Sequence, residues 1–163
     1  MNIINLNNYL NLMKKIILLL VAVVLCSVSG FAADATDTYS VDRSDLPQPA
    51  QDFLKEYFPK ARVGMVKTDK HLFKKTDYDV KLTNGTKIEF DNAGKWTSVD
   101  CKTVAVPSGI IPKAIRSYVS KNFSDVKIVK IEKSASKYEV DLSDGVELTF
   151  NPFGQFKSMK IDD

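Results

Sequence analysis

Histidine is the side chain that most often serves as a general base or a metal ligand, and this chain of 163 residues contains one, His71. Its neighbours from Thr68 to Lys75 are mostly charged or polar, which is typical of an exposed connection. A metal site with two histidine ligands cannot form within one such chain. The sequence therefore predicts neither a metal site nor a catalytic base at His71.

Paired carboxylates are the next candidates, because two of them in a pocket can act as general acid and base. Asp77 and Asp79 alternate with Tyr and Val, which places both on the solvent-facing side of one strand. Lys81 and Lys87 follow on the same side, so we expect cross-strand ion pairs rather than catalysis. Asp91-Asn92-Ala93-Gly94 is similar to the start of a calcium loop but lacks the later acidic ligands, and we expect a turn there.

The chain shows no nucleophile with an evident base and no glycine-rich phosphate loop after a strand. The sequence therefore predicts no catalytic residue, no cofactor and no metal ligand, and a protein that is not an enzyme. A small enzyme stays an alternative, and His71, Cys101 and the pair of Asp77 and Asp79 are the residues that would carry its activity.

Residues 1–32 have the composition of a secretory signal peptide. Lys14 and Lys15 precede an apolar run from Ile16 to Leu25, and small residues lead to Ala32. The run is shorter than the roughly 20 residues that cross a bilayer, and no later stretch is as apolar, so we expect no transmembrane segment in the mature chain. The predicted location is the periplasm or the extracellular space. Residues 33–45 are small and polar, which predicts a disordered tether.

Removal of the leader changes the charge and the cysteine count. The whole chain has 23 basic and 20 acidic residues, and the leader holds two of the lysines, which leaves 21 minus 20, or +1. A nearly neutral chain attracts nucleic acid weakly, so we expect no nucleic-acid partner. Cys26 lies in the leader, and Cys101 alone remains, without a partner for an intramolecular disulfide. We expect Cys101 to be a buried side chain at a strand end.

From residue 46 the chain repeats itself, which predicts two units at 46–104 and 105–163. At a spacing of 60 residues, for example, Tyr78–Leu82 corresponds to Tyr138–Leu142. Each unit opens with proline and apolar residues at helical spacing, followed by strands with alternating polarity. Asn84-Gly85 and Asp144-Gly145 predict two-residue hairpin turns, which need positive φ at both positions. The expected fold is α+β, in two tandem repeats of one helix followed by a four-stranded antiparallel sheet.

The aromatic residues of the last strand in each unit suggest a binding surface. Trp96 and Val99 are three residues apart, as are Phe156 and Met159, so each pair shares a face only where a bulge intervenes. Rings that face outward would form a patch suited to a partner protein, whereas rings that face inward would close the core. The candidate partner-binding residues are Trp96, Phe156, Phe153, Tyr78 and Tyr138.

A set of short motifs runs through the middle of the chain: Ile88-Glu89-Phe90-Asp91, Gly94-Lys95-Trp96, Val99-Asp100-Cys101-Lys102, Val106-Pro107, Ile110-Ile111-Pro112, and Tyr118-Val119 followed by Asn122-Phe123. A weaker copy follows in Tyr138-Glu139-Val140, Glu147-Leu148-Thr149-Phe150-Asn151 and Gly154-Gln155-Phe156. As a set, these motifs resemble the PepSY-like family of exported bacterial proteins, whose fold is similar to that of the β-lactamase inhibitory protein. The resemblance covers residues 46–162 and implies a tandem helix-plus-four-strand architecture, an exported location and a non-catalytic binding or inhibitory role. It brings no catalytic or binding residues.

We therefore expect an exported, non-catalytic binding module that recognises a protein or peptide. The alternative is an inhibitor of a secreted hydrolase, such as a β-lactamase or a protease, that uses the hairpin turns as probes. A structural envelope protein is a further alternative. The sequence favours no particular oligomeric state and does not identify the partner.

Overall fold

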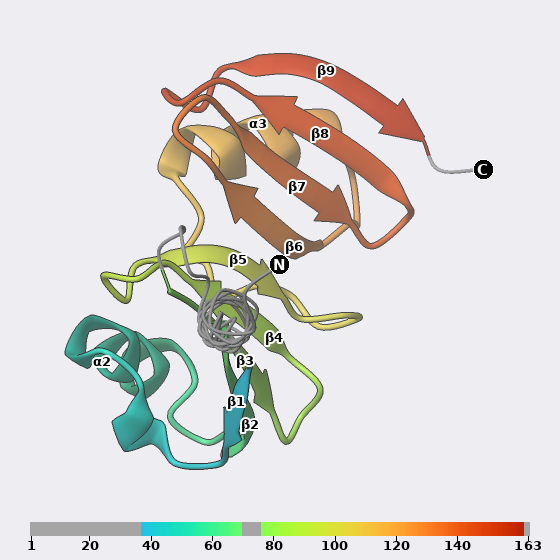
Figure 1. Ribbon diagram of the computed structural model, residues 1–163. Helices are drawn as coiled ribbons and strands as arrows, with labels where there is room; N and C mark the ends of the chain where they lie inside the picture. Colours follow the sequence, from blue (N-terminus) through green and yellow to red (C-terminus); the bar gives the residue numbers. More distant parts are fainter. Residues whose placement is uncertain (1–36, 70–75, 162–163) are drawn as a thin grey trace, which may run out of the picture. The chain divides into compact units, whose positions relative to one another are not determined.

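The computed structural model describes residues 37–69 and 76–161, and among these nine strands form one antiparallel sheet in chain order (Figure 1). The strands are β1 (Thr38–Ser40), β2 (Val63–Asp69), β3 (Asp77–Leu82), β4 (Lys87–Phe90), β5 (Trp96–Asp100), β6 (Ile128–Lys133), β7 (Tyr138–Leu142), β8 (Val146–Phe150) and β9 (Phe156–Ile161). The helices are η1 (Arg43–Asp45, a 3₁₀ turn), α2 (Gln48–Tyr57) and α3 (Lys113–Asn122). The predicted signal peptide and His71 lie outside the described residues.

The expected fold class, two tandem repeats each with its own four-stranded sheet, is wrong. β5 and β6 pair directly, with Ser98 opposite Glu132, Val99 opposite Ile131 and Asp100 opposite Lys130, so one sheet continues through the whole described region. With two α-helices beside nine strands, this region is mostly sheet. The alternation of polar and apolar residues along a strand indicates which face of the strand is buried. It does not indicate which other strand pairs with each of its edges. The domain boundaries at residues 46, 104 and 105 stay a prediction.

The first strand comes from the segment expected to be a disordered tether. β1 pairs antiparallel with β2, which places Tyr39 opposite Lys67 and Ser40 opposite Val66. Asp42 then caps η1, because its side chain accepts a hydrogen bond from the Ser44 N–H at 2.8 Å. Short polar residues gave no alternation from which this strand could be predicted.

One row of apolar side chains crosses the sheet from β2 to β9. The strand registers place its members opposite one another in the order Val66, Val80, Ile88, Val99, Ile131, Val140, Leu148 and Met159. The first seven are at most 2% exposed, whereas Met159 on the last strand is 52% exposed. This row defines the buried face of the sheet.

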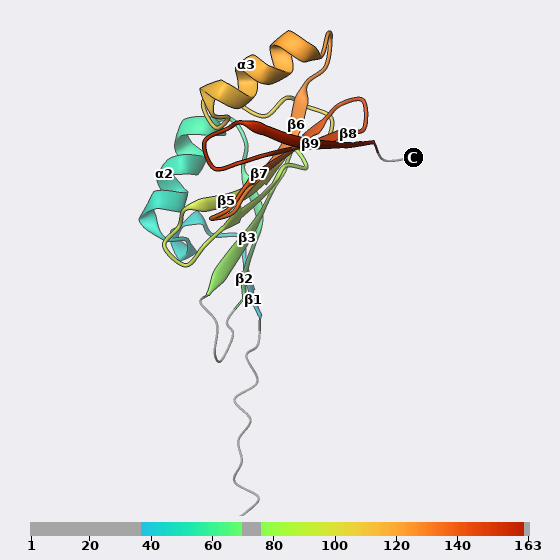
Figure 2. The same cartoon turned by 90° about the horizontal axis from the view of Figure 1, so that it is seen from above.

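Both α-helices pack on that face (Figure 2). α2 places Phe53 edge-on to Phe90, with the ring centroids 5.6 Å apart, and α3 places Tyr118 edge-on to Phe150 at 5.4 Å. A proline precedes each helix, and α2 ends at Tyr57, one residue before Phe58-Pro59, because a residue that precedes proline is disfavoured in helical geometry. The opposite face of the sheet carries no described helix.

The hairpin after β3 differs from the predicted two-residue turn. Gly85 has φ of 90°, but Asn84 is not among the residues with positive φ. The Gly85 N–H donates a hydrogen bond to the carbonyl of Leu82, and the Leu82 N–H donates one to the carbonyl of Thr86. These bonds enclose a three-residue loop in which one glycine takes the left-handed position, the usual alternative to a two-residue turn. Gly145, with φ of 89°, repeats this arrangement after β7.

Two bulges resolve the spacing of the aromatic residues. Glu89 lies opposite Ser98 and Phe90 lies opposite Trp96, so Thr97 is the extra residue of β5. The bulge brings Trp96 and Val99 onto the same buried face. An equivalent irregularity between β8 and β9 does the same for Phe156 and Met159.

Cys101 is buried directly after β5, as expected, and it is a free cysteine. Its N–H donates to the carbonyl of Val129 at 2.9 Å. Burial raises the pKa of the thiol, with a smaller opposing effect from the Thr86 hydroxyl. Cys101 packs in the buried core of the sheet.

Candidate functional site

The five aromatic candidates lie on the helix-covered face of the sheet or next to it. Tyr78 and Trp96 stand on either side of Phe90, and Tyr138 and Phe156 stand on either side of Phe150. Tyr78, Trp96 and Tyr138 are half-buried against the core. The open face of the sheet therefore contains none of the five.

Trp96 lies at the junction between β5 and β6. Its ring is 6.3 Å from that of Phe53 on α2, and the Lys133 ammonium lies 4.0 Å from its centroid on the other side. Such a cation–π contact contributes roughly 0.5–1 kcal/mol at a partly exposed position. Trp96 is thus held by intramolecular contacts.

Phe156 and Phe153 are the more accessible members of the set. Phe156 is 39% exposed, and its ring stacks on that of Tyr118 at 4.7 Å with an interplanar angle of 9°. Phe153 is 83% exposed in the turn before β9. The structure brings these two rings to the C-terminal end of the sheet, away from Tyr78 and Trp96 in the strand order.

The open face of the sheet carries a row of acidic side chains, which we name the acidic row: Asp79, Glu89, Glu132 and Glu139. They come from β3, β4, β6 and β7, and Ser98 of β5 lies between the two pairs. The Ser98 hydroxyl donates to Glu132 Oε1 at 3.5 Å. Alternation along each strand places these residues opposite the buried apolar row.

Within the acidic row, like charges lie directly opposite each other. Asp79 faces Glu89, and Glu132 faces Glu139. The expected ion pairs of Asp77 and Asp79 with Lys81 and Lys87 are not what the register gives, because Lys81 faces Lys87. Like charges directly opposite on a sheet are destabilising.

Burial and mutual repulsion raise the pKa of the carboxyl groups at one end of the row. Desolvation is the largest cause for both Asp79 and Glu89, followed by the charge of Asp69 for Asp79 and by that of Asp79 for Glu89. The positive charge of Lys67 offsets part of this repulsion, because its Nζ lies 2.6 Å from Asp69 and 3.0 Å from Asp37. These two carboxylates raise the pKa of Lys67.

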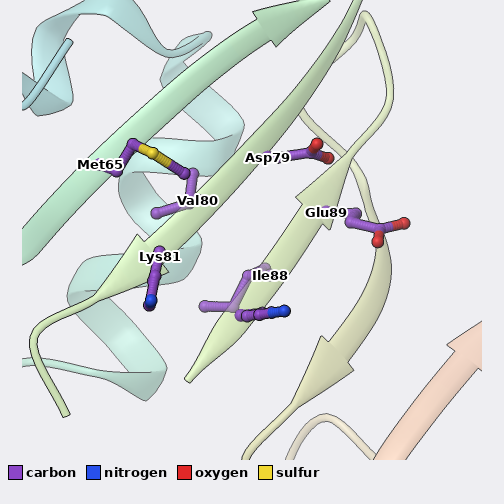
Figure 3. Close-up of a pocket in the computed structure, with 7 residues that line it drawn as sticks. Met65, Asp79, Val80, Lys81, Ile88 and Glu89 are labelled. Carbon is purple, nitrogen blue, oxygen red and sulfur yellow. The ribbon is translucent and has the colours of Figure 1, made fainter. Parts of the chain in front are cut away.

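Three depressions follow the acidic row. The first, of about 200 Å³, is lined by Met65, Val80 and Ile88 together with the charged residues Asp79, Lys81, Lys87 and Glu89. Figure 3 shows the carboxylates of Asp79 and Glu89 on neighbouring strands, with Lys81 farther along β3. A second, of about 360 Å³, lies toward Asp69 and Asp77, and a third, of about 210 Å³, is lined by Glu132 and Glu139 among others. These hollows can receive side chains of a partner.

The open face of the sheet is acidic along this row. Among the described residues, no group of three or more His, Cys, Asp or Glu side chains is arranged to hold a metal ion. Residues 91–94, which are similar to the start of a calcium loop, form a turn. In this turn Asp91 Oδ1 accepts hydrogen bonds from the N–H groups of Ala93 and Lys95, each at 2.9 Å. Carboxylates in rows can still bind the ammonium and guanidinium groups of a protein.

The acidic row was not predicted from the sequence, because the hairpin turn after β3 was expected to have two residues instead of three. A two-residue turn at Asn84-Gly85 would place Thr83 opposite Thr86, and therefore Asp79 opposite Phe90. The three-residue loop shifts the register by one, so that Asp79 meets Glu89. The glycine at the third loop position, followed by Thr86, was the available signal for this alternative.

Glu89→Gln is expected to stabilise the protein by about 0.5 kcal/mol at neutral pH, because it removes one charge from the repelling Asp79–Glu89 pair. The raised pKa of Glu89 means that the folded state holds its proton more tightly than the unfolded state, so this charge costs stability above its usual value of 4.5 and nothing well below it. Urea unfolding of both proteins at neutral and acidic pH checks this difference. Asp144→Asn, at an exposed position of the hairpin turn after β7 with ordinary φ, serves as the control. An equal gain at both pH values would contradict the electrostatic cause.

The described residues contain no helix that is long and apolar enough to cross a membrane. The family model described as "Putative beta-lactamase-inhibitor-like, PepSY-like" matches residues 76–158. No curated protein matches the sequence.

Three crystal structures of Bacteroides proteins are similar to this chain. A "putative periplasmic protein of unknown function" from Bacteroides vulgatus is 38% identical, covers 77% of this chain and 99% of its own, and has a TM-score of 0.74. A second protein from that species, of the DUF2874 family, is 42% identical over 79% and 98% of the two chains, with a TM-score of 0.72. A "putative calcium-regulated periplasmic protein" from Bacteroides thetaiotaomicron is 39% identical over 76% and 96%, also at 0.72.

These relatives confirm the predicted exported location, and the match over residues 76–158 confirms the resemblance drawn from the motifs. The protein is exported, like these periplasmic relatives, and the chain belongs to the PepSY-like family of beta-lactamase-inhibitor-like proteins.

Proposed function

We propose that this protein is a non-catalytic binding module of the periplasm, and that it recognises a protein or peptide with basic side chains on the open face of its sheet. The observation that supports the proposal is the acidic row: four carboxylates on four strands, with two like-charged pairs directly opposite each other. Lys130 and Lys137 already form ion pairs with Glu132 and Glu139. A basic partner would therefore chiefly relieve the repulsion between Asp79 and Glu89.

The geometry suits recognition of a surface better than catalysis. The acidic row runs across the strands and is flanked by hollows of about 200 to 360 Å³, each large enough for part of a side chain. Lysine or arginine side chains spaced along an extended partner segment would meet successive carboxylates. Opposite charges across such a surface raise the association rate and select against acidic partners.

The exposed aromatic residues add a second, smaller contact to the proposal. Phe153 and Phe156 lie at the C-terminal end of the sheet, where an apolar side chain of the partner could cover them. Tyr78, Trp96 and Tyr138 would contribute only through their exposed edges. We place the acidic row first because it occupies the uncovered face.

Inhibition of a secreted hydrolase is the narrower form of the same proposal, and the family description favours it by naming a β-lactamase-inhibitor-like protein. A hydrolase with a basic rim around its active site would be one such partner. Calcium occurs in the description of one relative. It forms no part of the proposal, because the acidic row is spread across four strands instead of converging on one point.

Capture from periplasmic extract, compared between matched variants, tests the proposal. We expect the wild-type chain to capture a defined set of basic proteins, and we expect Glu89→Lys with Glu132→Lys to lose it, because each change turns an acidic pair into a pair of opposite charges with no net negative charge. Asp52→Lys with Glu56→Lys is the control, since it makes the same total charge change at two exposed positions of α2, away from the open face. Purified partners are then assayed for hydrolase activity with and without the protein. Capture of the same set by wild type and the double variant would overturn the proposal.

A further inference from the structure

We propose that two copies of this chain pair antiparallel through their β9 strands, so that the sheet continues from one copy into the other. β9 is six residues long and lies at the end of the strand order, so its outer edge has no neighbour among the described strands. The N–H and C=O groups along such an edge can accept another strand. This inference does not depend on the function proposed for the acidic row.

The buried apolar row is the first reason. Its seven members from β2 to β8 are at most 2% exposed, because each has a strand on both sides. Met159 is the eighth member and is 52% exposed. Ile161, two residues on and therefore on the same face, is 61% exposed. A further strand beside β9 would extend the row and remove this apolar surface from water.

The junction between β5 and β6 shows how such a pair is built. Three residue pairs join these strands, and an apolar pair, Val99 with Ile131, stands between two polar ones in which Ser98 faces Glu132 and Asp100 faces Lys130. β5 carries the same bulge as β9 and still accepts a partner through the residues that follow it. The bulge of β9 is therefore no obstacle to pairing.

β9 can reproduce this pattern with itself. When Met159 lies opposite Met159 of a second copy, Ser158 lies opposite Lys160 on both sides of the twofold axis. An apolar pair again stands between two polar pairs, here serine with lysine on both sides, and no two lysines face each other. The same register keeps the faces matched, because residues 158 and 160 lie on the open face in both copies.

The alternative edge of a second copy fits less well. β1, the other end of the strand order, has three residues, half the length of β9. A contact between β9 and β1 would also be head-to-tail and would leave an open edge at each end of the growing assembly. Pairing of β9 with β9 closes after two copies.

Light scattering coupled to size-exclusion chromatography, over a concentration series of the chain from residue 33, tests the inference. We expect the mass to rise from one chain to two and then to stay constant. Met159→Glu places two carboxylates at the axis and should weaken association at least about tenfold. Val104→Glu changes an apolar residue of similar exposure outside β9 and should leave association unchanged. Circular dichroism establishes that both variants are folded.

Two changes at Ser158 test the register itself. Ser158→Asp would face Lys160 of the other copy twice and should tighten the dimer about fivefold, whereas Ser158→Lys should weaken it by a similar factor. A monomer at every concentration would overturn the proposal. So would a dimer that Met159→Glu leaves intact, since another surface would then join the copies, or a mass that grows without limit, which indicates head-to-tail pairing.

Discussion

Replacement of Phe150 by alanine is expected to lower the free energy of unfolding by about 3–5 kcal/mol, because it leaves a cavity in the core. Phe150 is fully buried, and its ring contacts those of Tyr118 on α3 and Phe156 on β9. The readout is the fluorescence of Trp96, the only tryptophan in the chain. Trp96 lies on β5, which β6 and β7 separate from β8, the strand that carries Phe150.

The distance between mutation and probe makes this a test of the continuous sheet. Because β5 pairs with β6, loss of the packing around Phe150 should shift the Trp96 unfolding transition as far as the transition seen by far-ultraviolet circular dichroism. Phe90→Ala, at the matching position beside α2, should give a similar loss. If Trp96 unfolded in Phe150→Ala at the wild-type denaturant concentration, the two halves would be independent and the single cooperative unit would be refuted.

Gly154→Ala is expected to cost about 2–4 kcal/mol, from an unfavourable backbone conformation and a steric clash together. Gly154 has φ of 77°, and a Cβ at this position would lie 2.9 Å from the Cβ of Ala114. The turn before β9 and the first turn of α3 touch at this point. The clash would have to push the helix away from the sheet.

Gly145→Ala separates the two causes. Gly145 has φ of 89°, yet a Cβ there meets no atom within 4 Å, so we expect only the conformational cost of about 1 kcal/mol. Urea denaturation of both variants gives the comparison. Equal losses would show that close packing of the turn against α3 contributes nothing.

Much of the local structure could be predicted from the sequence, because side-chain polarity reports burial directly. The alternation of Val80, Leu82, Ile88 and Phe90 with charged residues gave the strands and their buried face. The three-residue spacing of Trp96 and Val99 left two possibilities, a bulge or one residue that faces outward, and the structure contains the bulge. Pro47 and Pro112 directly precede the two helices, and Pro49 lies in the first turn of α2.

Pairing between strands was harder to predict. The loop at Gly85 was one residue longer than expected, and that single residue decides whether Asp79 meets an aromatic ring or another carboxylate. The contact between β5 and β6 joins strands separated by α3, and no turn motif marks it. Both the acidic row and the single sheet depend on these registers, so neither could be derived from the periodicity of one strand.

The order of the strands has a consequence for how the chain reaches its native state in the periplasm. Each strand pairs with the strand that precedes it and the one that follows it, so no segment has to be threaded between others that have already formed. A chain translocated from its N-terminal end can therefore add strands one at a time to a growing edge, and such near-neighbour pairing favours rapid folding for a protein rich in sheet. β9 is the last described strand to be added, and until it pairs, the edge of β8 is open to strands of other molecules.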